Sequence, residues 1–184
     1  MSEQELENAA GFAATPDAFQ RLWTPHRLVY IQNGQQPDQD ACPFCIGPTK
    51  TDEDALIVHR GKHAYVILNL YPYNSGHLLV CPYRHVDTYD KATPEEVVEI
   101  AEVTQQAMQV LKSVSHAHGF NIGMNQGEVA GAGIAGHLHQ HIVPRWRNDS
   151  NFFPIIAETK ALPKLLGEVR DEIARGWQAL PESR

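Results

Sequence analysis

Three histidines stand at alternate positions, His137, His139 and His141, and a pair of β-branched residues follows them. This period of two predicts a β-strand over residues 137–146, on which successive side chains point to opposite faces of a sheet. The three imidazoles would therefore share one face. Three imidazoles in a row make a poor hydrophobic core and a good polar site.

The residues just before the histidines, 131–136, read GAGIAG and carry almost no side-chain bulk. Their backbone N–H groups could approach an anion closely. The main competing interpretation is a tag-like metal-binding tract, but such tracts are usually terminal and low in complexity. This one is internal and flanked by strand-forming residues. A glycine-rich loop that leads into a row of histidines indicates phosphate chemistry.

The stretch HLHQHIV resembles the signature of the histidine triad (HIT) nucleotide hydrolases and transferases. The stretches NLYPYNSGHLLV and GMNQG resemble further segments of that family, and PRWRNDSNF resembles a bacterial subgroup related to diadenosine tetraphosphate phosphorylases. Gln140 departs from the family, which usually has an apolar residue there. Because Gln140 lies on the face opposite the histidines, we expect it to affect packing or an interface more than the chemistry.

The resemblance implies that His139 attacks the α-phosphorus of a nucleotide and forms a nucleotidyl-histidine intermediate. Neutral imidazole suits this role because its unperturbed pKa of ~6.5 leaves it uncharged near pH 7. We expect its other ring nitrogen to donate to a carbonyl. His141 would donate hydrogen bonds to phosphate oxygens, as would the N–H groups of Ala132 and Gly133. The family position of His77 implies that it supports the triad by hydrogen bonds.

The resemblance also implies residues that contact the rest of the nucleotide. Trp146 could stack on a base or on a neighbouring subunit, and the subgroup favours the substrate. Arg145 and Arg147 could reach a polyphosphate tail or simply lie on a solvated edge. The remaining implied contacts are two apolar residues of a base-binding wall and two asparagines near the ribose or phosphates: Phe44, Ile46, Asn69 and Asn125.

Cys42 and Cys45 form a Cys-x-x-Cys pair, which fits a zinc site, a redox dithiol or plain structure. The redox interpretation requires a thioredoxin-like βαβ unit, which the sequence does not suggest. Zinc requires two more ligands, and the resemblance supplies His85 and His137, since some triad proteins and related hexose-phosphate uridylyltransferases bind zinc in this way. Such a Cys₂His₂ set leaves no open position, so the zinc would be structural. The alternative is a free thiol pair beside a nucleotide pocket.

Periodicity predicts an α+β fold with an antiparallel sheet, in the order β-β-β-α-β-β-α. A capping box at Thr93 begins one long amphipathic helix, which we expect to end at Gly119, with His116 and His118 in its last turn. The HIT-like fold implied by the resemblance packs such a helix on the sheet. The predicted strands in this order are 54–59, 64–69, 77–82, 120–125 and 137–146, and a further short strand is expected over 27–31. A brief helical turn over 17–23 and a loop over 32–41 are also expected. The C-terminal helix is expected over 163–177, with Leu165, Leu166, Val169, Ile173 and Trp177 on one side.

The chain has 184 residues, 42% of them hydrophobic and 20% charged, which is an ordinary composition for one soluble domain. We expect a flexible extension over residues 1–15 and a single HIT domain, including the C-terminal helix, over 16–184. The formal charge of −7 argues against a non-specific binder of nucleic acid. No leader or apolar run of transmembrane length is apparent, and three cysteines make no disulfide framework, so a cytoplasmic location is the default.

The leading functional hypothesis is an enzyme that cleaves dinucleoside polyphosphates, especially diadenosine tetraphosphate. Inorganic phosphate would make it a phosphorylase and water a hydrolase, and the sequence does not separate the two. One alternative is hydrolysis of nucleoside phosphoramidates, and another is a nucleotide-binding sensor whose catalysis is incidental. The resemblance implies a homodimer or a tetramer. We expect no organic cofactor, no nucleic-acid partner and no membrane partner.

Overall fold

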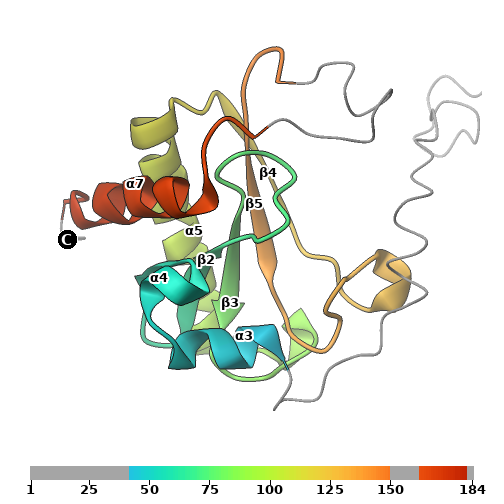
Figure 1. The fold of residues 1–184 in the computed structure, drawn as a ribbon. Helices are drawn as coiled ribbons and strands as arrows, with labels where there is room; N and C mark the ends of the chain where they lie inside the picture. The colour runs from blue at the N-terminus through green and yellow to red at the C-terminus, as the bar shows by residue number, and fades with distance from the viewer. Residues whose placement is uncertain (1–41, 150–161, 182–184) are drawn as a thin grey trace, which may run out of the picture. The chain divides into compact units, whose positions relative to one another are not determined.

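The computed structural model describes residues 42–149 and 162–181, all within the second of the two units into which the chain divides, residues 34–184 (Figure 1). The elements expected before residue 42 lie outside the described residues, and the domain boundary at residue 15 stays a prediction. The helices are α3 (Pro43–Ile46), α4 (Asp52–Ala55), α5 (Pro94–Ser115) and α7 (Leu166–Gln178). The strands are β1 (Ile57–Arg60), β2 (Ala64–Leu68), β3 (Leu78–Pro82), β4 (Gly119–Gly123) and β5 (Gln140–Arg145).

The five strands form one sheet in the order β1-β2-β3-β5-β4, and each neighbouring pair is antiparallel. The predicted α+β class and the antiparallel sheet are therefore confirmed. The crossover that places β5 between β3 and β4 is important for function. It brings the histidine segment next to β3, which follows His77.

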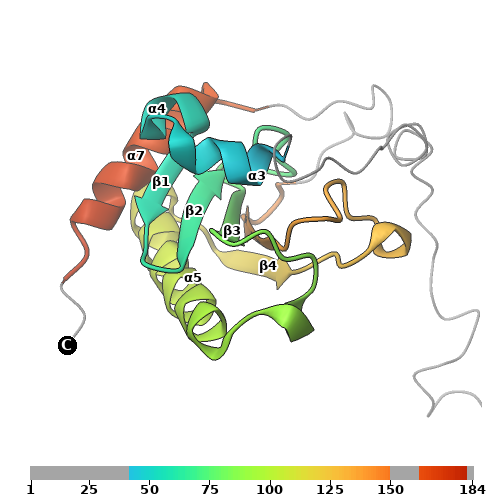
Figure 2. The same ribbon diagram turned by 90° about the horizontal axis from the view of Figure 1, so that it is seen from below.

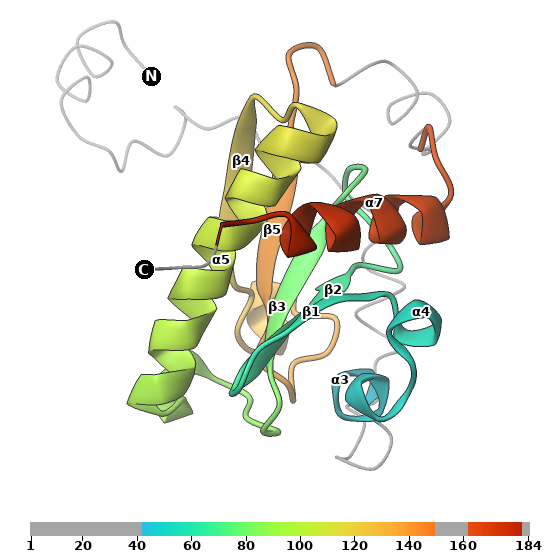
Figure 3. The same ribbon diagram turned by 90° about the vertical axis from the view of Figure 1, so that its left-hand side faces the viewer.

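Alternation along the strands divides the buried residues between two sides of the sheet. Val66, Leu68, Leu78 and Val80 pack with α5 and α7, whereas Tyr65, Leu79 and Cys81 pack with Cys42 and Phe44 around α3. Figures 2 and 3 show α3 and α5 on opposite sides of the sheet, with α7 crossing α5 on the same side. The side facing α3 is the one on which the candidate site is built.

The start of α5 is as predicted, but its end is not. Thr93 and Glu96 make both hydrogen bonds of the capping box, so the helix begins at Pro94. The helix ends at Ser115, where His116 takes the left-handed conformation with φ 52°, a conformation that histidine adopts more readily than most residues. His116 is thus the C-cap and His118 lies beyond the helix, because Gly119 already begins β4.

Other predicted boundaries were also wrong, among them the end of the strand predicted over 120–125, which the structure ends at Gly123. Residues 54–56 were expected in a strand, but Thr51 caps the short helix α4 and accepts a hydrogen bond from Asp54 N. The histidine strand begins at Gln140 rather than at residue 137, because Leu138 N donates to Val86 O and not to a strand. The C-terminal helix begins at Leu166, and Leu165 is 74% exposed rather than packed.

None of the helices within the described ranges is both long enough and apolar enough to cross a lipid bilayer.

Candidate functional site

His139 is held in the state that a nucleophile requires. Its Nδ1 lies 2.7 Å from the backbone oxygen of His137 and donates to it, so Nε2 carries the lone pair. The ring is only 6% exposed and packs against the Phe44 ring, with 5.0 Å between the centroids. Burial lowers the pKa of His139 below the ordinary value of 6.5, and the carbonyl opposes this shift. The imidazole is therefore neutral and nucleophilic near pH 7.

His77 and His141 form an imidazole pair beside His139. Nε2 of His77 lies 2.9 Å from Nδ1 of His141, and the centroids of the His139 and His141 rings are 5.0 Å apart. His77 lies just before β3 and His141 on β5, which pair directly in the sheet. Sheet pairing therefore places His77 beside the triad, as the sequence resemblance implied.

The backbone fixes which nitrogen of each ring in the pair carries hydrogen. Tyr73 N donates to Nδ1 of His77 at 3.0 Å, so that nitrogen is an acceptor and Nε2 of His77 carries the hydrogen. His77 then donates to Nδ1 of His141, which leaves the hydrogen of His141 on its Nε2. His141 is thereby a hydrogen-bond donor, whereas the neighbouring Nε2 of His139 is an acceptor.

The loop before β3 holds His77 in place. Asn69 Nδ2 lies 3.3 Å from Nδ1 of His77, and Asn69 N donates to the His77 carbonyl at 2.8 Å. Gly76 has φ +75°, a left-handed conformation that side chains rarely adopt, and a Cβ there would lie 3.3 Å from a Leu111 methyl group. Asn69 thus supports His77 directly, in addition to any contact with a ligand.

Cys42, Cys45, His85 and His137 come together, as the sequence resemblance implied. One candidate ligand atom from each lies within 4.8 Å of the others. Nδ1 of His137 is 3.5 Å from each thiol sulfur, and Nδ1 of His85 is 3.2 Å from Cys45 Sγ. Ligands at tetrahedral zinc, with bonds of about 2.3 Å to sulfur and about 2.0 Å to nitrogen, would be roughly 3.6 Å apart. These four residues could therefore hold a metal ion.

His137 is prepared for such a ligand role. Its Nε2 lies 2.9 Å from the backbone oxygen of Pro82 and donates to it, which leaves the Nδ1 lone pair facing the thiols. Metal-bound histidines commonly have such a partner on their other nitrogen. Burial lowers the pKa of His137 to about 4, so the ring is neutral, as metal binding requires.

Of the predicted nucleotide contacts, Phe44 and Asn69 contact the site histidines directly. Phe44 packs on both His137 and His139 and is 7% exposed. Asn125 lies two residues beyond Gly123, which pairs with His141. Ile46 is partly buried at the end of α3, Gly133 is partly buried, and Ala132 N donates to Gly127 O at 3.4 Å, so the nucleotide contacts predicted for these residues stay predictions.

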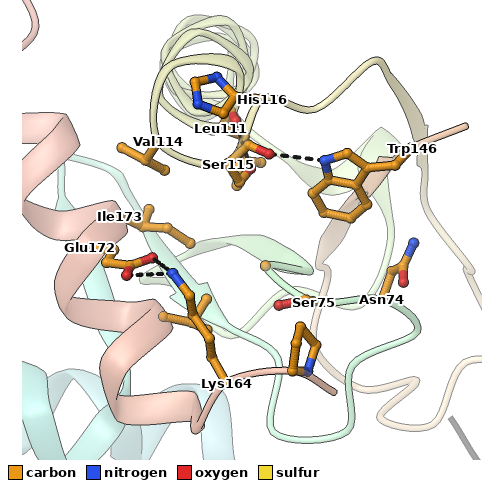
Figure 4. Close-up of a pocket in the computed structure, with 13 residues that line it drawn as sticks. Asn74, Ser75, Leu111, Val114, Ser115, His116, Trp146, Lys164, Glu172 and Ile173 are labelled. Carbon is orange, nitrogen blue, oxygen red and sulfur yellow. Dashed lines mark hydrogen bonds and ion pairs between the residues drawn. The ribbon is translucent and has the colours of Figure 1, made fainter. Parts of the chain in front are cut away.

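Trp146 and Arg145 make contacts within the chain, and their contact with substrate stays a prediction. Trp146 Nε1 donates to Ser115 O at 2.9 Å, and the indole lines a cavity of about 390 Å³ between α5 and α7 (Figure 4). The triad histidines do not line that cavity. Arg145 forms an ion pair with Asp149 at 2.7 Å, and the exposed Arg147 follows Trp146.

Sequence reasoning missed Tyr73 and Asn74. The Tyr73 ring stacks on His141, and Asn74 Nδ2 bridges Pro144 O and Asp149. Residues 72–76 were interpreted only as a loop. The spacing of Tyr73, four residues before a buried histidine, was the available signal. Gln140 was predicted to lie on the face opposite the histidines, and its Nε2 donates to Thr104 Oγ1 of α5 at 2.6 Å.

The sequence profile of the HIT domain matches residues 50–148. The chain belongs to the HIT family. It is 46% identical over 171 residues to a protein of Mycobacterium tuberculosis named AP-4-A phosphorylase, which covers 90% of this chain and 88% of the relative. It is 34% identical over 93 residues to a bis(5'-nucleosyl)-tetraphosphatase [asymmetrical] of Schizosaccharomyces pombe, covering 50% of each chain.

The fold also matches solved structures of this family. A Zn-bound histidine triad family protein from Mycobacterium smegmatis superposes with a TM-score of 0.62 at 25% identity, covering 77% of this chain and 96% of that one. The family and the HIT-like fold predicted from the sequence are therefore confirmed.

Proposed function

We propose that this HIT protein cleaves dinucleoside polyphosphates at an α-phosphate, and that it does so as a phosphorylase. The observation that carries this proposal is the state of His139. It is a buried, neutral imidazole whose Nδ1 is committed to a carbonyl, so Nε2 can attack phosphorus.

The proposed reaction has two displacements at one phosphorus. In the first, Nε2 of His139 forms a bond to the α-phosphorus while the bond to the bridging oxygen breaks, and the second nucleotide departs with the electron pair. In the second, an oxygen of inorganic phosphate attacks the same phosphorus and returns the electron pair to Nε2. The hydrogen on Nε2 of His141 is in position to stabilise negative charge on the phosphate oxygens.

The similarity to relatives supports the choice of substrate. The M. tuberculosis relative, matched over nine-tenths of this chain, is named for phosphorolysis of AP-4-A, whereas the S. pombe relative, matched over half, is named a tetraphosphatase. Attack by phosphate and attack by water would use the same histidines. The longer and closer match favours phosphate as the acceptor.

We propose zinc as the metal for the Cys42–Cys45–His85–His137 cluster. Two thiols and two imidazoles suit zinc, and four protein ligands would close the site. The bound ion would cross-link α3 to the segments before β5 and after β3. Its contribution is structural, and no step of the reaction is assigned to it.

We further propose a homodimer in the cytoplasm. β4 is an edge strand whose last three residues, Asn121 to Gly123, are exposed, and Ile122 is 45% exposed. Such an edge offers unpaired backbone groups to a second copy. The three free cysteines fit a reducing compartment.

The proposal is tested by incubating the protein with diadenosine tetraphosphate, with and without inorganic phosphate. ADP and ATP formed only with phosphate would support the phosphorylase, and AMP and ATP formed without it would indicate a hydrolase. An α-phosphate label should be recovered on the denatured wild-type protein but not on His139→Ala. His118→Ala removes an exposed histidine remote from the triad segment in sequence and provides the control.

Two results would replace the proposal. Faster turnover of a lysine-linked nucleoside phosphoramidate than of the dinucleotide would favour the amine-releasing activity. Tight nucleotide binding with negligible turnover of either substrate would favour a sensor.

A further inference from the structure

We propose that Tyr73 is a positioning residue for His141, an inference that rests on the proposed function of the triad. Its ring covers the hydrogen bond between His77 and His141 and thereby keeps His141 in the tautomer that makes it a donor.

The argument begins with ring geometry. The Tyr73 ring lies 4.7 Å from the His77 ring and 5.7 Å from the His141 ring, measured between centroids. The plane of the Tyr73 ring is nearly parallel to that of His141, at 14°, and is tilted by 41° from that of His77. One aromatic ring therefore contacts both members of a pair that are themselves 5.1 Å apart.

Burial shows which side of the pair the tyrosine occupies. His77 is completely buried and His141 is partly buried, whereas Tyr73 is 43% exposed. The phenol ring is thus the most exposed of the three rings, and it covers part of the imidazole pair. Because an imidazole–imidazole hydrogen bond competes with water for the same donor and acceptor, a dry cover strengthens it.

The tautomer matters because it decides the sign of the interaction at phosphate. With hydrogen on Nε2, His141 donates to an oxygen as negative charge develops. If water replaced His77 at Nδ1 of His141, the hydrogen could move to Nδ1. Nε2 would then present a lone pair to the phosphate oxygens. The loss would fall on the chemical step more than on substrate binding.

The side chain can be tested separately from the backbone. The contact from Tyr73 to His77 Nδ1 comes from the main-chain N–H, which every variant at this position except proline retains. Tyr71 provides a matched control because it is an exposed tyrosine of the same loop, 77% accessible to solvent. Its main-chain N–H also bonds a side chain of the site, Asn69 Oδ1, at 3.0 Å.

The experiment compares Tyr73→Ala, Tyr73→Phe and Tyr71→Ala as purified full-length proteins. Imidazole ¹⁵N NMR near neutral pH reports the tautomer of His141, and steady-state kinetics with diadenosine tetraphosphate and phosphate report kcat and KM. We expect Tyr73→Ala to show mixed His141 tautomers and a kcat lowered about tenfold or more, a part of the 10²–10³-fold cost of losing a transition-state donor, with KM within about twofold. Tyr73→Phe and Tyr71→Ala should match the wild type in both measurements.

Retention of a single His141 tautomer and of kcat in Tyr73→Ala would overturn the proposal. Equal losses in Tyr73→Ala and Tyr73→Phe would also overturn it, since the phenol oxygen and not the ring would then be responsible. If Tyr73→Ala does not fold, Tyr73→Thr gives the same comparison. The NMR measurement needs no turnover, so it still decides the role of Tyr73 if the substrate assignment fails.

Discussion

His137 and His139 stand two residues apart and use opposite ring nitrogens. His137 donates from Nε2 to Pro82 O and turns Nδ1 toward the two thiols. His139 donates from Nδ1 to the carbonyl of His137 and leaves Nε2 for attack on phosphorus. The residue type and the burial are nearly the same in both cases. The backbone carbonyl within reach of each ring therefore decides which histidine is suited to a metal and which to catalysis.

The two regions are also joined through His137 and Phe44. The side chain of His137 belongs to the cysteine–histidine cluster, whereas its carbonyl fixes the tautomer of His139. Phe44, between the two cysteines of α3, packs on both rings. A substitution in the cysteine–histidine cluster should therefore lower activity moderately. A substitution of His139 should not lower the metal content.

The largest expected effect is that of His139→Ala. Removal of the proposed nucleophile should lower kcat/KM by about 10³-fold or more, because no other imidazole in the segment presents an Nε2 lone pair. Metal content and Tm should stay at the wild-type values. Kinetics, elemental analysis and thermal unfolding check this. A large loss of metal in this variant would contradict the separation of the two regions.

Cys45→Ala should act mainly on stability. It removes a ligand that lies near both His85 and His137, so metal content should fall by most of its wild-type value. Loss of a structural ion should cost about 3–5 kcal/mol, or roughly 10 °C in Tm for a chain of this size. Elemental analysis and calorimetry measure both. Activity should fall less than in His139→Ala, and Cys81→Ala, which changes a buried cysteine outside the cluster, should retain the metal.

The pH dependence should identify His139 as the titrating group. Burial lowers its pKa below 6.5, so the ring stays neutral as pH falls through the ordinary imidazole range and protonates only at lower pH. The acid limb of kcat/KM should thus have its midpoint below 6.5. A pH–rate profile for substrate at low concentration measures it. A midpoint at or above 6.5 would show that a different group limits the reaction.

Gln140→Leu should have the smallest effect. Gln140 lies between His139 and His141 in sequence but donates to Thr104 on α5, behind the sheet. Since Thr104 also donates to Ile100 O, the apolar replacement should change the unfolding free energy by less than about 1 kcal/mol. Catalytic constants should be unchanged. A loss of activity comparable to that of Tyr73→Ala would show that the two faces of β5 are coupled.

The sequence was sufficient for local patterns and for motifs, but not for contacts across loops. Strand alternation placed His139 and Gln140 on opposite faces, and the capping box at Thr93 located the start of α5. The end of that helix was missed because His116 adopts a left-handed backbone conformation that glycine would have signalled more clearly. Trp146 bonds to the last residue of α5, a contact that no local pattern encodes, and its predicted contact with substrate stays a prediction.

The two edge strands of the sheet, β1 and β4, differ in their contacts with the rest of the chain. On β1, the guanidinium of Arg170 in α7 donates to the carbonyl of Ile57 at 2.7 Å, so one carbonyl of this strand is already bonded within the protein. β4 lies at the opposite edge, and in the described sheet no strand pairs with its outer side. A sheet that can be extended from one side only can join one other copy and then has no edge left to offer. The proposed dimer would therefore terminate its own growth, and variants that release Arg170 from β1 would be the ones prone to form fibres.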